Sequence, residues 1–599
     1  MWVKCAFGQL NTSLLESSFL ACYEVYKGSL RLDGQTLSNL EIFNNNADGG
    51  ETGTLFSFLN NCSTSFGKRL LRRWICHPLQ RIGDINDRLD ALEDFSSHPE
   101  LVGVLRAGLR KLPDLERLVP QIQRFSASSL EATIPLLSNR EKKRKAQAFC
   151  AAVKGLLNGI SLIKYMNREI HEVAIRSQLL LAASNTEGLT EAHGLLELTA
   201  PHIEERFSFS RKQSAKQDFI LDEKDTELLN DLLLAFNQHL QCWRLVICNL
   251  AQLDVLLSFS VTINGANGPT CRPILISSSS DTSKGGGILK IEELWHPFAS
   301  GAQCSGVFVR NNVNLGSDSP PHRAILLTGP NMGGKSTLLR ATCITVILAQ
   351  MGCYVPAESC LLSPVDTIFT RLGASDRIMS GESTFMVECT EASSVLRHAT
   401  PDSLVILDEL GRGTSTFDGY AIAYSVFRHL VDSVDCRLLF ATHYHPLTKE
   451  FAAHPRVSLQ HMACGFQETA IKGSANCAGS GKEINAKERS LVFLYKLSPG
   501  ASPDSYGLHV ASLAGLPSTV IERAEEARKI LHSRLSSTFK KNAHRVHFSH
   551  IHDQWLRTIL GASRPDESSC TLTEMEDAHD LLLCIWHELQ GSLSKLRRT

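Results

Sequence analysis

A glycine-rich loop lies between an apolar run, AILLT (324–328), and a helix-like run that begins TLLRATC. It reads GPNMGGKS and matches the pattern GxxxxGK[ST], whose glycines let backbone N–H groups turn toward phosphate oxygens. The helix that follows adds the positive end of its dipole. A turn with an incidental lysine is the competing interpretation, but the complete motif and its flanks argue against it. The residues predicted to bind the phosphates of a nucleotide are Gly329, Pro330, Asn331, Met332, Gly333, Gly334, Lys335, Ser336 and Thr337.

Two further apolar runs end in polar residues that fit the same chemistry. SLVILDE places Asp408 and Glu409 at the end of a strand, and LLFATHYH brings His443 to the same edge of the sheet. We expect Lys335 to reach the β- and γ-phosphates of ATP, and Ser336 and Asp408 to hold Mg²⁺. Glu409, His443 and Lys335 form the expected catalytic set, with Glu409 orienting or activating water and His443 sensing the γ-phosphate. Taken singly, such acids and histidines are more often structural; beside the phosphate loop, we favour hydrolysis.

Composition limits the remaining possibilities. The 599 residues contain 61 Lys+Arg and 62 Asp+Glu, so net charge neither supports nor excludes a DNA partner. The 18 cysteines form no CxxC pair, which fits free thiols in a reducing compartment better than a zinc site. The sequence has no uninterrupted apolar run of about 18 residues, so we expect no membrane partner.

The spacing of apolar residues changes along the chain. INDRLDALEDF and KLPDLERLVPQI place apolar residues three and four apart, which is typical of helices. We expect an all-helical domain over 31–205, one long helix over 223–262, an α/β domain over 263–530 and a helical tail over 531–599, a candidate for dimerisation.

The motifs resemble those of the MutS family of DNA mismatch-repair ATPases. The strings that carry the resemblance are TGPNMGGKST, SGESTFMVE, DELGRGTSTFDG and ATHYH, with LRLDGQTLSNLEIF (30–43) and FGKRLLRRWICHPL (66–79) in the helical half. HMAC (461–464) and FLYKLSPGASPDSYGLHVASLAGLP (493–517) are similar to the eukaryotic mismatch-reading branch of MutS-alpha type and its plant-specific relative. The resemblance implies an α plus α/β fold, in which an all-helical lever domain precedes an ABC-type P-loop ATPase domain with a mixed sheet.

The resemblance also implies roles for residues outside the loop. Each ATP site would be completed by the partner chain, with Ser383 reaching the γ-phosphate held by a second MutS homologue. Phe308 would stack on adenine and Asn331 would help to position the phosphates. A helix cap, a core aromatic and a turn residue remain the structural alternatives for these three. Tyr495 stands where bacterial relatives have histidine, which leaves that contact unassigned.

Two regions look shorter than in the family. Residues 1–30 are expected to be a connector remnant, and 206–222 a shortened clamp whose Arg211, Lys212 and Lys216 either touch DNA phosphates or are simply solvated. The string Phe466-Gln467-Glu468 lies inside the ATPase region and is not the Phe-x-Glu wedge that reads mismatches. We therefore expect a natural short form or a fragment of a longer protein, and the short clamp favours the plant relative.

The implied function is that of a nuclear DNA mismatch-repair ATPase subunit. It would bind mismatched double-stranded DNA as part of a MutS-type heterodimer, with ATP binding and hydrolysis switching the grip on DNA. The alternatives are a MutS-related ATPase of meiotic recombination and an assembly subunit with little hydrolysis. REKKRKAQ (140–147) is either a nuclear address or a basic helix face.

Overall fold

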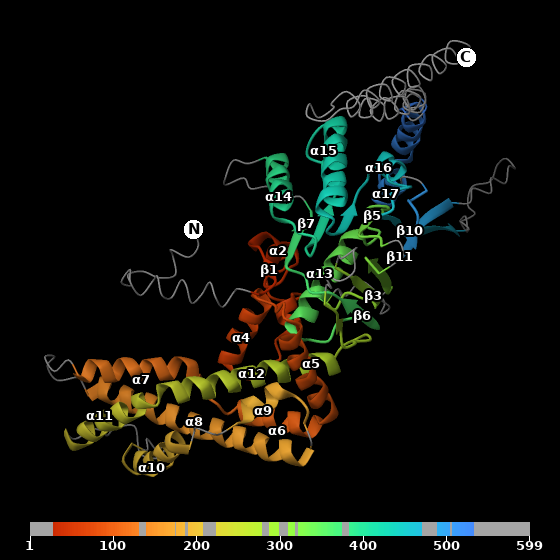
Figure 1. The fold of residues 1–599 in the computed structure, drawn as a ribbon. Helices are drawn as coiled ribbons and strands as arrows, with labels where there is room; N and C mark the ends of the chain where they lie inside the picture. Colours follow the sequence, from red (N-terminus) through yellow and green to blue (C-terminus); the bar gives the residue numbers. More distant parts are fainter. Residues whose placement is uncertain are drawn as a thin grey trace, which may run out of the picture. The chain divides into compact units, whose positions relative to one another are not determined.

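The computed structural model describes residues 28–130, 139–173, 175–185, 190–207, 223–277, 287–298, 309–317, 321–373, 383–469, 488–503, 506–531 and 533. The expected connector remnant, clamp remnant and C-terminal tail lie almost wholly outside these residues, as do Arg211, Lys212, Lys216 and Phe308. The chain divides into two compact units, Met1–Ser505 and Tyr506–Thr599. The first unit contains a helical region followed by a region built on two sheets (Figure 1). The second contains helix α17 (Gly507–Leu513) among its described residues.

Helices dominate the first half, where the apolar residues recur at helical spacing. Hydroxyl side chains cap three of them: Thr54 accepts from the Ser57 N–H, Thr64 from the Gly67 N–H, and Ser177 from the Leu180 N–H. In chain order the helices are α2 (Gly34–Asn39), α3 (Leu55–Leu59), α4 (Ser65–Cys76), α5 (Ile82–Ser97), α6 (Pro99–Leu109), α7 (Leu115–Leu130), α8 (Asn139–Val173), α9 (Gln178–Ser184), α10 (Thr190–Phe207), α11 (Glu223–Gln238) and α12 (Leu240–Asn264).

The single helix expected over 223–262 is in fact two helices, interrupted at His239. The apolar pattern continues across the break, so periodicity alone does not reveal it. The Phe236 carbonyl accepts from the Trp243 indole N–H at 2.9 Å and from the His239 N–H at 3.2 Å. The Phe236 carbonyl is therefore satisfied even though the helix is interrupted there. One of its donors, Trp243, is completely buried.

A buried carboxylate ties α12 to the start of α4. Asp254 Oδ1 accepts from the Ser63 N–H, and Oδ2 accepts from both the N–H and the hydroxyl of Thr64, at 2.6 to 2.8 Å. Gly67 leaves room for the carboxylate, because a Cβ there would lie 2.2 Å from Oδ2. Burial raises the pKa of Asp254, while the hydrogen bonds from Thr64 and Ser63 oppose that shift.

Seven strands form the larger sheet, in the order β1-β7-β8-β9-β5-β10-β11. Its strands are β1 (Arg31–Leu32), β5 (Ala324–Thr328), β7 (Thr367–Arg371), β8 (Leu404–Asp408), β9 (Arg437–Ala441), β10 (Val457–Thr469) and β11 (Glu488–Pro499). The expected mixed sheet is confirmed, because β10 and β11 pair antiparallel at one end of a parallel sheet. A second sheet, in the order β2-β6-β3-β4, contains β2 (Ile274–Leu275), β3 (Leu289–Leu294), β4 (Asn311–Leu315) and β6 (Ser359–Leu362).

Alternate residues of the central strands face two different cores. On β5, Ile325 and Leu327 join the core that contains α13 (Lys335–Met351) and the helical region. Leu326 faces the opposite core, with α14 (Thr384–His398), α15 (Thr416–His429) and α16 (His445–Glu450). The π-helix η3 (Leu430–Val434) follows α15 directly. Burial on both faces explains why these strands read as continuous apolar runs.

Among the described residues, the helical region contacts the sheet region at several places, two of which involve Arg88 and the first strand. The Arg88 guanidinium of α5 lies 3.4 Å from the centre of the Trp74 ring and donates to the Met351 carbonyl at the end of α13 at 2.8 Å. At the second place, Arg31–Leu32 form an edge strand that pairs in parallel with β7. The expectation that 31–205 is all-helical is therefore wrong at its first residues, because a sheet edge provides partners for their backbone groups.

Two helices among the described residues are long and apolar enough to span a membrane by length and composition, namely Glu141–Ile170 and Leu240–Asn264. Within their most apolar windows, 56% and 72% of the residues are buried inside the protein. Burial of this extent is also found in the core helices of globular proteins, so length and composition are weak support for a membrane span.

We expect Asp254→Ala to lower the free energy of unfolding by about 3 kcal/mol, because two amides and a hydroxyl would lose their buried acceptor. Thermal unfolding followed by circular dichroism measures the effect. Glu51→Ala is the control, since Glu51 is 62% exposed in a surface ion pair with Arg72. That loss should stay below about 1 kcal/mol. Equal destabilisation by the two substitutions would contradict the role assigned to Asp254.

Candidate nucleotide site

The glycine-rich loop connects the end of β5 to the start of α13. Its backbone turns through left-handed conformations at Gly329 (φ 136°), Met332 (φ 67°) and Gly334 (φ 95°). The Lys335 side chain is only 5% exposed, and its ammonium donates to the carbonyls of Gly329 at 2.9 Å and Pro330 at 3.1 Å. Burial lowers the pKa of Lys335, while the charges of Glu409 and Asp408 act in the opposite direction.

A hydroxyl and a carboxylate meet at the first turn of α13. The Ser336 hydroxyl donates to Asp408 Oδ2 at 2.6 Å, which joins the phosphate loop to the end of β8. Asp408 Oδ1 is buried and has no hydrogen-bond partner among the described residues. Burial raises the pKa of Asp408, and the Ser336 hydrogen bond opposes this. Hydroxyl and carboxylate oxygens are the ligands that Mg²⁺ prefers, so the buried oxygen of Asp408 fits such a cation.

Glu409 lies beside Asp408 but in a different environment. Its backbone is left-handed (φ 56°), which turns its side chain away from the path of the strand. Glu409 Oε1 is 2.6 Å from His443 Nε2, and Oε2 accepts from the Arg412 guanidinium. The hydrogen bond from His443 lowers the pKa of Glu409, and burial acts against it. Glu409 is therefore held as an oriented carboxylate.

The structure brings five of the predicted residues into one group: Lys335, Ser336, Asp408, Glu409 and His443. Asn331, Met332 and Thr337 are exposed around the loop. Ser383 caps α14 by accepting from the Met386 N–H at 3.2 Å, and among the described residues it shares no hydrogen bond with the group. Its expected role toward a partner site and the stacking of Phe308 on adenine stay predictions.

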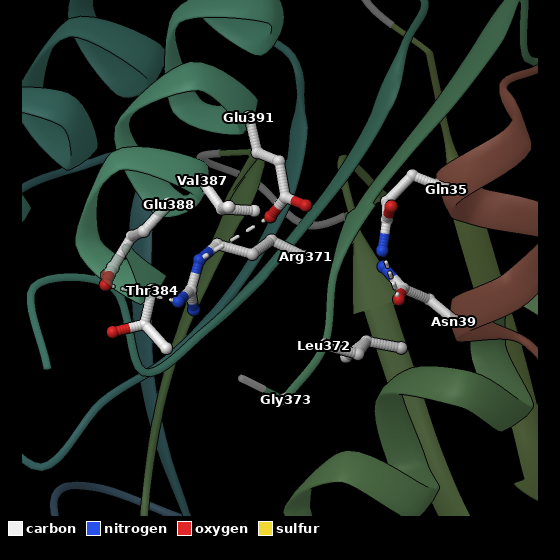
Figure 2. Close-up of a pocket in the computed structure, with 9 residues that line it drawn as sticks. All are labelled: Gln35, Asn39, Arg371, Leu372, Gly373, Thr384, Val387, Glu388 and Glu391. Carbon is white, nitrogen blue, oxygen red and sulfur yellow. Dashed lines mark hydrogen bonds and ion pairs between the residues drawn. The ribbon is translucent and has the colours of Figure 1, made fainter. Parts of the chain in front are cut away.

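Sequence reasoning missed a buried polar cluster behind Asp408. Figure 2 shows Arg371, the last residue of β7, pointing toward Glu388 and Glu391 of α14. The Arg371 guanidinium donates to the main-chain carbonyl of Asp408 at 2.6 Å and lies 3.3 Å from Glu388 Oε2. One signal was available in the sequence, because Arg371 is the fifth and last residue of the strand TIFTR, as Asp408 is of the strand LVILD.

Sequence reasoning also left the surroundings of the loop at β10 and β11 unassigned. A Cβ at Gly334 would lie 3.2 Å from a ring carbon of Tyr495 and 3.4 Å from the methyl group of Met462. These side chains from β11 and β10 therefore flank the phosphate loop. Tyr495, whose contact the sequence left unassigned, thus lies beside Gly334 of the phosphate loop.

A phosphate loop on a buried parallel strand, joined to an acidic pair at the end of another, defines the sheet region as a P-loop nucleotide-binding domain. The model of MutS domain V matches residues 325–532, and that of MutS domain III matches residues 35–260. The chain belongs to the MutS family, as its motifs had indicated, and its sheet region is the family's ATPase domain.

Several curated relatives support this assignment. The chain is 48% identical over 579 residues to the DNA mismatch repair protein MSH7 of Arabidopsis thaliana, covering 95% of this chain and 50% of the relative. It is 33% identical to the DNA mismatch repair protein Msh6 of Homo sapiens over 82% of this chain and 43% of the relative. Identity to MSH6 of Saccharomyces cerevisiae is 32% over 88% of this chain and 46% of the relative. The chain thus spans about half the length of these relatives.

We expect Lys335→Ala to weaken ATP binding by about tenfold or more, because the phosphates lose a charge-assisted hydrogen bond inside a buried loop. Titration with a fluorescent ATP analogue measures the dissociation constant. Lys449→Ala is the control, since it removes an exposed lysine from the last turn of α16. Unchanged affinity in Lys335→Ala would remove this lysine from the phosphate site.

Proposed function

We propose that this chain is an ATP-hydrolysing subunit of DNA mismatch repair. The observation that carries the proposal is the joined set of polar residues on the MutS domain V scaffold. Ser336 contacts Asp408, and the neighbouring Glu409 contacts His443, all around the phosphate loop. A protein that only binds nucleotide has no need of the second pair, so this set favours hydrolysis over an assembly subunit with little turnover.

Magnesium fits the first pair of side chains. The Ser336 hydroxyl and the Asp408 carboxylate would hold Mg²⁺, which when bound would neutralise charge that develops on the phosphates. Asp408 makes this fit, because its buried Oδ1 has no hydrogen-bond partner within the part of the chain that the structure describes. The Lys335 ammonium has three N–H donors, two of which bind the carbonyls of Gly329 and Pro330, so the third can donate to a phosphate oxygen.

Glu409 and His443 are proposed to act on the attacking water. Glu409 is ionised and fixed from two sides, by His443 and by Arg412, so one of its oxygens is positioned to accept a hydrogen bond from water. His443 Nε2, 2.6 Å from that carboxylate, holds its orientation. In this proposal His443 would also respond to a γ-phosphate. These are roles of orientation, which is where most catalysis of phosphoryl transfer comes from.

A second MutS-family chain is proposed as the partner. Phe417, at the start of α15, is 80% exposed, and Met386, in the first turn of α14, is 56% exposed. Met386 lies three residues after the cap residue Ser383, and exposed apolar side chains such as these two are suited to a surface that another chain covers. In such a pair, Ser383 would reach the nucleotide held by the partner.

Mismatched double-stranded DNA is the proposed substrate of the pair, and the nucleus its location. Both rest on the likeness to proteins named for DNA mismatch repair, three of which come from a plant, a yeast and an animal. The basic run REKKRKAQ gives the nuclear proposal little support, because it lies within the helix α8. Its Lys145 is only 6% exposed, and the ammonium lies 5.6 Å from the centre of the Phe125 ring. Within the described helix the run therefore acts as part of a helix face.

We expect Glu409→Gln to keep ATP binding but to lower kcat by about a hundredfold, because the amide cannot accept a proton or hold water as a carboxylate does. Steady-state phosphate release, measured with the partner chain present, gives the rate. Glu358→Gln, which changes an exposed glutamate, is the control. Wild-type turnover in Glu409→Gln would contradict the role proposed for this carboxylate.

We expect the chain to sediment together with a second MutS-family chain as one larger species when ATP is present. Phe417→Asp should weaken that association by about tenfold or more, because it places a charge in an apolar contact. Leu245→Asp is a matched control, since Leu245 is 52% exposed on α12 in the helical region. Two separate species in the presence of ATP would contradict the composite site.

A further inference from the structure

The peptide group that joins Asp408 to Glu409 is held at both ends. Its carbonyl accepts from Arg371 Nη1 at 2.6 Å, and its N–H donates to the Ala441 carbonyl at 2.9 Å. The orientation of this peptide sets the directions in which the two carboxylates leave the strand. Glu409 has a left-handed backbone, which is unfavourable for a residue other than glycine. The surroundings must therefore stabilise this conformation.

Glu388 fixes the loop that follows. Its Oε1 accepts from the Gly411 N–H, and its Oε2 accepts from the Gly413 N–H at 3.3 Å. These amides lie on either side of Arg412, whose guanidinium contacts Glu409. A single carboxylate on α14 thus holds the loop that supplies one of the partners of Glu409.

Arg371 and Glu388 also contact each other. We call this ion pair, together with its bonds to the Asp408 carbonyl and to the Gly411 and Gly413 amides, the joint. Their side chains are 7% and 3% exposed, and Arg371 Nη2 is 3.3 Å from Glu388 Oε2. Asn39 of α2, labelled in Figure 2, lies on the other side of Arg371 from α14. Its side-chain amide donates at 3.1 Å to the carbonyl of Thr370, the residue before Arg371. The joint therefore connects the residues before and after Glu409 to α14, the helix that Ser383 caps.

We propose that Arg371 and Glu388 are positioning residues that set the orientation of Glu409 and couple it to movement of α14. The inference rests on the proposed ATPase function and assigns it two further residues. When a partner chain or a nucleotide shifts α14, Glu388 carries that shift to the Gly411–Gly413 loop and, through Arg371, to the peptide before Glu409. Neither residue touches nucleotide or water in this role.

A contribution to stability alone does not explain the joint. Burying two charges is costly, and a well-packed apolar pair of similar volume often gives equal or greater stability. The partners are also specific, because all of them are main-chain groups of the short segment 408–413. Arg371 donates to one carbonyl of this segment, and Glu388 accepts from two of its amides. An apolar pair would leave these main-chain groups without partners. The arrangement thus fixes a backbone conformation, and the conformation it fixes is that of the acidic pair.

The test is Glu388→Gln in the full 599-residue chain, with Glu358→Gln, which changes an exposed glutamate outside this cluster, as the control. Glutamine presents an amide N–H₂ group where Glu388 has a second acceptor, so this N–H₂ group would face another N–H donor. We expect kcat to fall by about tenfold while the dissociation constant for ATP changes by less than about threefold. The control substitution should change kcat by less than about twofold.

Hydrogen exchange gives a readout that does not depend on turnover. In Glu388→Gln, the amides of Gly411 and Gly413 should exchange about tenfold faster, while those of β5 keep their rates. Unchanged exchange at Gly411 and Gly413 would overturn the joint, and faster exchange with unchanged kcat would overturn its positioning role. A wild-type chain without ATPase activity would instead count against the proposed function, since the exchange result stands by itself.

Arg371→Lys keeps the inference testable where Glu388→Gln does not fold. Lysine can donate to the Asp408 carbonyl and keeps the buried charge, but its single ammonium nitrogen lacks the planar fork whose Nη1 contacts that carbonyl and whose Nη2 contacts Glu388. We expect an intermediate loss of kcat, about threefold to tenfold, with ATP binding retained. Wild-type kcat in Arg371→Lys, or loss of ATP binding in step with kcat, would contradict a positioning role.

Discussion

The burial of α13 is the constraint on which the rest of the molecule depends. Its residues from Leu338 to Met351 are almost entirely inside the protein, including three with polar side chains, Thr342, Thr345 and Gln350. Each of the two threonines donates back to a carbonyl one turn earlier, so neither needs water. A helix buried in this way has no freedom to shift alone, and the phosphate loop at its first residue is consequently held in place from behind.

The other end of α13 is where the helical region is attached. Gln350 donates to the Leu79 carbonyl at 2.8 Å, Arg88 donates to the Met351 carbonyl, and Gly352 (φ 77°) leaves room for Arg88, whose Cβ would lie 2.5 Å from a Cβ at that position. The helix carries the phosphate loop at one end and the helical region at the other. Movement of the helical region therefore has a short path to the phosphate loop, through hydrogen bonds to the end of α13 and then along this one helix of 17 residues.

Sequence reasoning succeeded where one local pattern carried the information. The phosphate loop has fixed spacing and a strand and helix on either side, so its position and the parallel strands around it followed from the letters alone. The break at His239 could not be predicted, because the apolar period continues across it and the Trp243 indole decides the outcome in three dimensions. The strand Arg31–Leu32 is too short to show a period and exists only because β7 offers it an edge.

The residues behind the site were missed for a related reason. Arg371 was visible as a polar residue at the end of an apolar run, but its partners belong to β8 and α14, and no spacing rule connects them. Local patterns identify groups that contact a ligand, because the chemistry of the ligand restricts their types. Groups that contact only the main chain of those residues have no such restriction, so the structure is needed to find them.

The acidic pair shows what the surrounding contacts accomplish chemically. Burial raises the pKa of Asp408, whereas the hydrogen bond from His443 lowers that of its neighbour Glu409. The pKa values of two adjacent carboxylates are thereby shifted in opposite directions, as is common for pairs with different chemical roles. A carboxylate with a lowered pKa stays ionised but accepts a proton less readily, so the environment of Glu409 favours orienting water through a hydrogen bond over taking its proton early. In a loose transition state the water needs little deprotonation before it attacks, and orientation is then the larger contribution that Glu409 can make.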